Sequence, residues 1–238
     1  MFAYDAQLAA ATQVPPQSIP DVLQLLQTID NLCVAGDGLK YFNGLYLQVT
    51  QAVENRVAGG GFSDPVWLAE LDVQFAGLYF SALSSGLTGG PCPGCWEAMF
   101  SCRDQSKIAR IQFALAGMNA HINHDLPLAV VAICQAENTK PQHGTAQYND
   151  YTAVDTTLDG LIDTAKRELN VRLLGDALPD VSHLEDLFAA WNLGAARGQA
   201  WNTAESLWQD SALAAKIRMD GIDGLTTVIG KALLVPVP

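Results

Sequence analysis

The side chains best suited to chemistry gather in one short stretch of an otherwise apolar tract, Leu115 to Val130. Five polar residues lie there within seven positions: Asn119, His121, Asn123, His124 and Asp125. Apolar flanks on both sides are typical of a buried helix. Buried polar groups cost free energy unless they are paired, so this cluster requires a structural or a functional explanation.

His121 and Asp125 are four residues apart, and residues at that spacing share one face of a helix. The pair could ligate one cation, or Asp125 could orient His121 so that the imidazole acts as a base. Asn119 and Asn123 share another face in the same way, and we expect both to contact a substrate.

A purely structural interpretation of the same stretch remains open. Pro127 should kink the tract or split it in two, because proline removes a helical hydrogen bond. If the chain breaks at His121 to Asn123, Asp125 could cap a new helix that begins at Leu126. His121 and the asparagines would then satisfy the backbone groups at the break.

Asp72 is a second candidate, because it shares a helical stripe with Phe75, Ala76 and Tyr79. An acid on an otherwise apolar stripe could be the partner of His121 or of a cation. Phe75 and Tyr79 would then form walls of a pocket. The alternative is that Asp72 is a surface acid at the edge of its helix.

The third candidate group is a helical set of four residues: Trp191, Arg197, Trp201 and Glu205. Arg197 could pair with a buried carboxylate such as Asp72 or Asp125. Trp201 could form another wall of the pocket. The alternative is an ordinary salt-bridged helix face with tryptophan packing.

The sequence has five cysteines and no recognisable export signal, which favours free thiols. Cys92-Pro-Gly-Cys95 is similar to half of a redox or metal site. A zinc knuckle needs four ligands, and only Cys102 lies nearby. A thioredoxin-type motif should open a helix in a strand–helix unit, which the sequence does not predict. A loop disulfide and two unused thiols both remain open.

The sequence predicts that helices position these residues. No run of six residues alternates between apolar and polar side chains as a strand should. Helices are expected after Ser18 and over these ranges: 37–57, 63–86, 96–101, 106–136, 151–174, 183–209 and 211–234. Residues 86–95 and 138–149 should be loops. The expected fold is a single all-α domain, residues 1–238, of seven to eight helices with a kinked central helix.

Composition limits the possible partners. The net charge is −12, and no basic run exceeds two residues, which argues against nucleic acid. No segment approaches the roughly 18 apolar residues of a membrane span, and a cytoplasmic location is expected. Charged residues make up only 16% of the chain, against about 25% in an average protein. Part of the surface could therefore form a homo-oligomer contact.

The segment Gly117-Met-Asn-Ala-His-Ile-Asn-His-Asp-Leu-Pro127 resembles the signature of a bacterial family of unknown function. The stretch Leu71 to Tyr79 and the helix that contains Trp191, Arg197 and Trp201 are similar to that family too. The resemblance covers most of the chain and implies no particular activity.

A more distant resemblance is to the helical zinc-dependent phospholipase C and P1-type nuclease superfamily. Those enzymes carry a histidine and an aspartate four residues apart on a core helix, followed by a proline, as His121, Asp125 and Pro127 are here. The second histidine of that pattern would fall near Val131, which cannot bind metal. The resemblance therefore implies at most one divalent metal ion, held by His121 and Asp125.

These observations favour a small-molecule enzyme with a buried polar pocket. His121 would be base or ligand, Asp125 its partner and Asp72 a second carboxylate, while Asn119 and Arg197 would orient the substrate. Hydrolysis, or lyase or cyclase chemistry on an apolar or biosynthetic substrate, would fit, with no cofactor or a single divalent metal ion. The alternative is a non-catalytic ligand-binding or interaction protein in which the same polar residues form a structural network.

Overall fold

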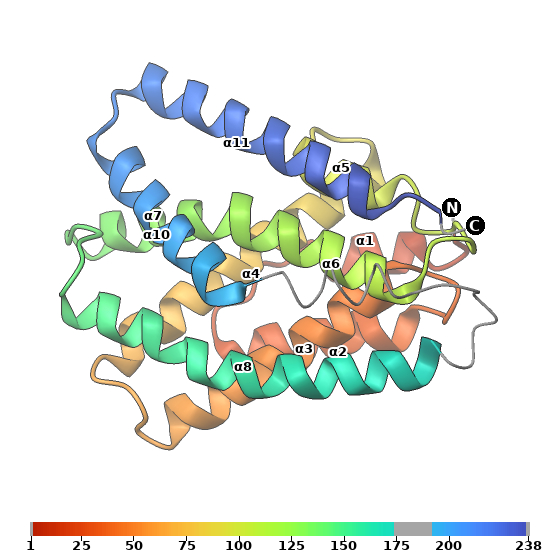
Figure 1. Cartoon of the computed structure of the whole chain (residues 1–238), viewed down its shortest axis with the longest axis horizontal. Coiled ribbons are helices and arrows are strands. Elements are labelled where there is room, and N and C mark those ends of the chain that lie inside the picture. The colour runs from red at the N-terminus through yellow and green to blue at the C-terminus, as the bar shows by residue number, and fades with distance from the viewer. Residues whose placement is uncertain (1, 174–191, 237–238) are drawn as a thin grey trace.

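The computed structural model describes residues 2–173 and 192–236 as an all-α single-domain bundle (Figure 1). Its first helices are α1 (Asp5–Ala11), α2 (Ile19–Leu32), α3 (Leu39–Ala58), α4 (Pro65–Thr88) and α5 (Gly94–Phe100). They are followed by α6 (Arg110–Ala120), the π-helical turn η1 (His121–Asp125), α7 (Leu126–Ala136), α8 (Ala146–Leu173), α10 (Leu193–Gln209) and α11 (Ala212–Leu233). No strand occurs within these described ranges, and the all-α prediction is confirmed.

Helix starts follow the capping residues that the sequence shows. The Ser18 hydroxyl accepts a hydrogen bond from the Asp21 amide at 3.3 Å, and Asp64 caps α4 by accepting from the Trp67 amide at 3.1 Å. Each cap is followed by a proline in the first turn, where the missing N–H leaves no hydrogen bond unmade. The predicted starts of α2 and α4 are therefore confirmed.

Other boundaries differ from the prediction. Helix α1 was not predicted. Helix α8 begins at Ala146, inside the predicted loop 138–149, because the Thr145 hydroxyl accepts from the Tyr148 amide at 3.2 Å and caps its first turn. In the predicted helix 183–209, α10 begins at Leu193, and residues 183–191 lie outside the described part of the chain.

The central helix neither breaks nor ends at Pro127. Helices α6 and α7 form one continuous run through η1, as Figure 1 shows. The Leu126 amide donates to the carbonyl of His121, five residues earlier, which is the hydrogen bond of a π-turn. Asp125 makes no side-chain cap, so the interpretation of this stretch as a capped helix start is wrong. The wide turn comes just before the proline and brings a cluster of polar side chains into the core.

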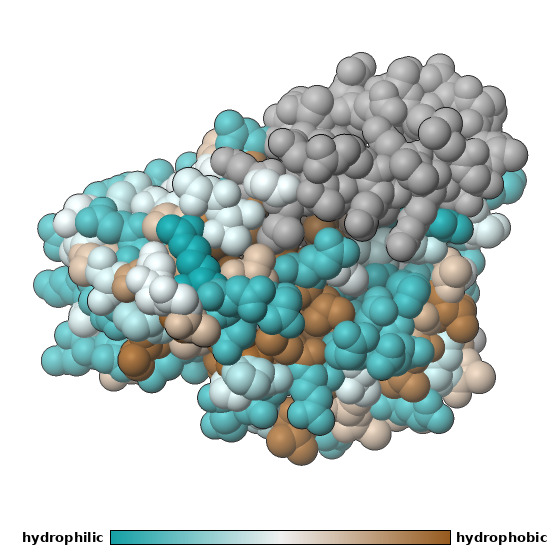
Figure 2. All heavy atoms as spheres, turned by 90° about the horizontal axis from the view of Figure 1, so that it is seen from below, coloured by the Kyte–Doolittle hydropathy of each residue, from teal (hydrophilic) through white to brown (hydrophobic). Residues whose placement is uncertain are grey.

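Two groups of buried side chains form the core, one on each side of η1. The first lies between α2, α3, α4, α5 and α6, and the second between α4, α7, α8 and α10. On the outside, hydrophilic side chains cover most of the described surface seen in Figure 2, with hydrophobic ones in separate patches between them. No helix in the described ranges is long and apolar enough to cross a membrane.

Helix α11 packs across α5, α6 and η1. The Asn119 side-chain amide donates to the Thr226 carbonyl at 2.9 Å in the middle of α11. The Gln112 side-chain amide donates to the carbonyls of Leu233 and Val235, each at 2.7 Å, where α11 ends. These bonds fix α11 against the central helix at two levels.

The close approach of α3 to α6 depends on Gly117. A Cβ atom built there would lie 2.3 Å from Cγ of Phe42, near the root of a side chain that has no room to move in the core. We expect Gly117→Ala to lower the free energy of unfolding by about 1–3 kcal/mol because of this overlap. Urea denaturation followed by circular dichroism measures the change.

Gly198 in α10 is the matched control, because a Cβ atom there meets nothing within 4 Å. Gly198→Ala should raise the free energy of unfolding by up to about 1 kcal/mol, since alanine favours the helix. Equal stability of the Gly117→Ala protein and the parent would show that α3 can move away from α6 without cost.

Candidate functional site

The carboxylate of Asp125 is the centre of the candidate site. It is 2% exposed, and three nitrogen atoms surround it. Nε1–H of Trp96 donates to Oδ2 at 2.9 Å, and Nδ1 of His121 lies 3.0 Å from the same oxygen. Nδ1 of His124 lies 2.7 Å from Oδ1. An ionised carboxylate can only accept hydrogen bonds, so both Nδ1 atoms carry the proton.

Charge is retained on Asp125 despite its burial. Burial alone would raise the pKa of Asp125, but the hydrogen bonds from His121 and His124 outweigh it and lower that pKa below the ordinary value. The carboxylate is therefore ionised at neutral pH. The predicted pairing of His121 with Asp125 on one helix face is present, and His124 and Trp96 join it.

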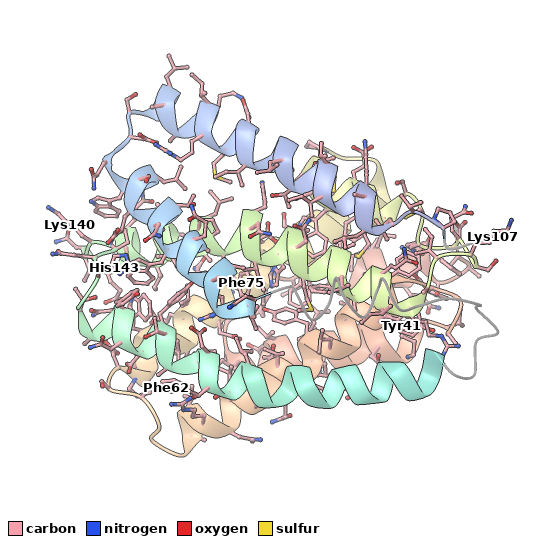
Figure 3. All side chains as sticks on the ribbon, in the orientation of Figure 1. Tyr41, Phe62, Phe75, Lys107, Lys140 and His143 are labelled. Atoms are coloured by element: carbon pink, nitrogen blue, oxygen red, sulfur yellow. The ribbon has the colours of Figure 1, made fainter. Side chains whose placement is uncertain are left out.

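His121 lies in a box of aromatic rings, and its imidazole stacks on Phe75 with centroids 3.5 Å apart and planes at 7°. Four other rings lie with their centroids 4.7–6.1 Å from that of the imidazole: Tyr46, Phe42, Trp96 and Tyr79. Figure 3 places Phe75 in the interior of the bundle and His143 at one end of it. The predicted neighbours Phe75 and Tyr79 are thus part of this box.

The imidazole of His121 is neutral. Burial lowers its pKa, and this outweighs the opposite effect of Asp125. With the proton on Nδ1, the lone pair is on Nε2. That atom is buried and has no hydrogen-bond partner among the described residues. The arrangement, a carboxylate that holds one nitrogen while the other stays free, is the geometry of a general base.

Six further buried polar atoms also lack a well-formed hydrogen bond within the described ranges: Tyr46 Oη, Thr50 Oγ1, Trp67 Nε1, Asp72 Oδ2, Thr139 Oγ1 and Trp201 Nε1. Tyr46 and Thr50 are neighbours on one face of α3, and the Tyr46 ring lies 4.7 Å from that of His121. Burial first, and the charge of Asp72 second, raise the pKa of Tyr46 well above its ordinary value. Unsatisfied buried polar atoms are rare, and those of Tyr46, Thr50, Asp72 and His121 belong to three elements, α3, α4 and η1.

Asp72 is half-buried, and its Oδ2 atom is fully buried. Burial raises its pKa to about 7, Glu54 adds to this effect, and the positive charge of Arg197 opposes it. Asp72 is thus partly protonated at neutral pH. No direct hydrogen bond between Asp72 and His121 is present in the described part of the chain.

The remaining predicted site residues have partners inside the fold. Asn123 donates through its side-chain amide to Oδ1 of Asn119 at 3.0 Å, and Asn119 in turn holds α11. Arg197 pairs with Asp155, with Nε and Oδ1 2.6 Å apart, rather than with the predicted Asp72 or Asp125. It also donates to the Tyr151 carbonyl at 2.7 Å. These residues therefore brace the helices around the site.

Trp201 is fully buried in the second core group, against Trp67, Tyr148 and Tyr151. Its ring does not stack on His121, so the proposed wall at Trp201 belongs to a different part of the core. Trp191, from the same predicted group, lies outside the described residues.

The five cysteines all lie within the described ranges and are free, so of the two alternatives for Cys92 and Cys95 the structure has the unpaired thiols and not the loop disulfide. Cys95 belongs instead to a cluster of possible metal ligands with His124 and Asp223. Trp96, Tyr46 and Asp223 were missed by the sequence analysis. Their signal is weak, because an aromatic residue or a lone acid on a helix gives no sign of its distant partner.

Three surface hollows are lined by described residues. The largest, about 650 Å³, lies against α4 and includes Glu54, Glu70 and Val73. The second hollow lies between α7, α10 and α11. The third lies beside α4 and α5. The linings of these three hollows do not include His121.

Comparison with known proteins places the chain in a family and gives no activity. The model of the family described as "Family of unknown function (DUF5995)" matches residues 19–236. No protein of curated function and no solved structure matches the chain. The match includes every helix of the site, from α2 to α11, and the chain therefore belongs to the DUF5995 family of unknown function.

Proposed function

We propose that the protein is an enzyme that acts on a small molecule by general acid–base catalysis, with His121 as the base. The observation that carries this proposal concerns the Nε2 atom of His121. It is buried and has no hydrogen-bond partner within residues 2–173 and 192–236, while Asp125 holds the other ring nitrogen, Nδ1. A base in this state can take a proton from a bound molecule without first losing one of its own. Asp125 is a positioning residue that fixes the tautomer.

Asp72 is the proposed acid. Its pKa of about 7 keeps a proton available at neutral pH, as a catalytic acid requires. His121 would take a proton from carbon or from water, and Asp72 would give one to the leaving group or to a developing negative charge. The proton count then balances for an elimination, a cyclisation or a hydrolysis.

The proposed class of substrate is based on the rings around His121. Phe75, Tyr46 and Tyr79 offer apolar faces, while the Tyr46 and Thr50 hydroxyls are available as hydrogen-bond partners. A small, largely apolar or aromatic molecule with one or two oxygen atoms matches these surroundings. Of the reaction types in the sequence-based prediction, lyase or cyclase chemistry needs the fewest additional groups.

One observation favours a second candidate, a binding or interaction protein with a structural polar network. Asn119 and Arg197 hydrogen-bond within the fold and brace α11 and α10. If His121 is one more member of such a network, its replacement should damage stability and leave any ligand effect unchanged. Substitution of His121 therefore separates the two candidates.

His121→Gln should keep the fold and abolish turnover. Removal of a general base lowers the rate about 10²–10⁴-fold. A pool of small metabolites is incubated with the parent or the variant, and mass spectrometry identifies any compound that only the parent consumes. His143→Gln is the control, because His143 lies at one end of the bundle, away from Phe75, and contacts Glu205, Asn202 and Tyr148 there. A large fall in thermal stability of His121→Gln with an unaltered product profile would favour the structural network.

The tautomer of His121 can be tested without a substrate. Long-range nitrogen–proton NMR should show His121 protonated on Nδ1 and bare on Nε2 at pH 7, with a pKa below the ordinary value of about 6.5. The signal is assigned by its loss in His121→Gln. Asp125→Asn should change the tautomer ratio, because the charged acceptor is gone. A proton on Nε2 in the parent protein would contradict the assignment of His121 as a ready base.

Asp72 should leave a signature in the pH dependence of stability. Its pKa is near 3.8 in an unfolded chain and about 7 in the folded one, so between these values the folded state binds more protons. Stability therefore falls as pH rises from about 4 to 7 and stays lower above that range. The loss should be on the order of 1–3 kcal/mol and absent in Asp72→Asn.

Urea denaturation of the parent and of Asp72→Asn at a series of pH values measures this difference. Asp220→Asn is the control, because Asp220 is an exposed acid in an ion pair on α11, and its curve should follow that of the parent. Parallel curves for the parent and Asp72→Asn would mean that Asp72 carries its charge at neutral pH, and it could not then be the acid.

A further inference from the structure

Cys95, His124 and Asp223 come together from three elements that are far apart in the sequence. Cys95 lies in the first turn of α5, His124 in η1 and Asp223 in the middle of α11. One ligand atom of each residue lies within 4.8 Å of the others. Cys95 and His124 are buried and Asp223 is half-buried, so the group borders the surface on the α11 side.

His124 is oriented as metal-binding histidines are. Its Nδ1 donates to Oδ1 of Asp125 at 2.7 Å, which leaves the lone pair of the ring on Nε2. A carboxylate that accepts a hydrogen bond from one nitrogen while the other binds the ion is the usual outer partner in zinc sites. Asp125 has this relation to His124 through one oxygen and to His121 through the other.

Asp223 is held beside Cys95 by the backbone. Its Oδ2 accepts from the Gly94 amide at 3.0 Å and its Oδ1 from the Cys95 amide at 2.9 Å. Each oxygen keeps a second lone pair for an ion. The approach is possible because residue 94 is glycine: a Cβ atom there would lie 3.1 Å from Oδ2 of Asp223 and 2.8 Å from Thr227 Oγ1.

We propose that Cys95, His124 and Asp223 bind one zinc ion. A thiolate, an imidazole and a carboxylate form a donor set that suits zinc, whereas magnesium and calcium prefer oxygen atoms alone. Ligand atoms at the usual zinc distances, about 2.0–2.3 Å, lie roughly 3.3–3.7 Å apart around a tetrahedral ion. The three ligand atoms, now within 4.8 Å of one another, would need to close by at most about an ångström.

Binding requires one covalent change, the loss of the Cys95 proton. The thiol releases this proton to the solvent as the sulfur bonds to zinc, and His124 binds as neutral imidazole. Three protein ligands leave the fourth position of the ion for water or a small ligand. The proposal differs from the predicted pairing of His121 and Asp125, because here the ligand is His124 and Asp125 acts as its hydrogen-bond partner.

The zinc proposal does not depend on the proposed catalysis by His121. His121→Gln should lose turnover and still bind metal, while Cys95→Ser should lose metal. The two ideas can therefore fail separately.

Cobalt(II) is the probe, because a cobalt–thiolate bond gives an ultraviolet charge-transfer band. The full chain is purified without chelators, stripped of metal by dialysis against a chelator, and titrated with cobalt chloride. One equivalent should bind and produce the band, and added zinc chloride should displace the cobalt and remove the band. Absence of the band, or a band that zinc leaves unchanged, would overturn the proposal.

Variants identify the ligands. Cys95→Ser should abolish the band and Asp223→Asn should weaken metal binding by at least about tenfold, since even outer partners contribute 10–100-fold. Cys92→Ser and Asp220→Asn are matched controls, and both variants should bind cobalt as the parent does. Cys92 is a cysteine three residues before Cys95, and Asp220 is a second acid of α11. A band that survives Cys95→Ser, or disappears in Cys92→Ser, would contradict the proposed ligand set.

Thermal unfolding provides a second measurement in case Cys95→Ser does not fold. Zinc that binds only the folded state should raise the melting temperature of the parent protein in proportion to the logarithm of free zinc. Magnesium should cause no rise, and the rise with zinc should be smaller for Asp223→Asn. An equal rise in the parent and in Asp223→Asn would exclude Asp223 as a ligand.

Discussion

The structure depends on a buried carboxylate. An ionised group in an apolar core is tolerated only when donors surround it, and Asp125 has three, from Trp96, His121 and His124. These donors come from α5 and from the turn that contains Asp125 itself. The need to satisfy this one side chain thus determines where α5 lies and how the central helix runs. It also determines which ring nitrogen carries the proton in His121 and His124. Loss of any one donor would leave part of the charge unpaired in the core.

The sequence predicted the parts of this arrangement that lie within one helix. The four-residue spacing placed His121 beside Asp125, and the stripe on α4 placed Phe75 and Tyr79 on the face that meets them. Capping residues also located α2 and α4. Such features are local, because the geometry of one helix determines which of its side chains are neighbours.

Contacts between distant helices could not be predicted in this way. Arg197 has the charge to pair with any acid in reach, and only the packing of α10 against α8 selects Asp155. Likewise nothing in the spacing of Cys95 or Asp223 indicates that α11 crosses α5 at their level. The π-turn was missed for a related reason. Pro127 signals a disturbance of the helix, but the way in which the backbone accommodates it depends on the groups around Asp125.

The π-turn also sets the rotational phase between the two halves of the central helix. An α-helix advances about 100° per residue, so one extra residue in a turn rotates all that follows by roughly that angle. Here α6 presents its side chains to one core group and α7 presents its own to the other. A regular α-helix without this turn would keep its apolar side chains on one face along its length. With η1 between them, α6 and α7 pack into separate core groups. The polar side chains lie in η1, where the direction of the apolar face changes.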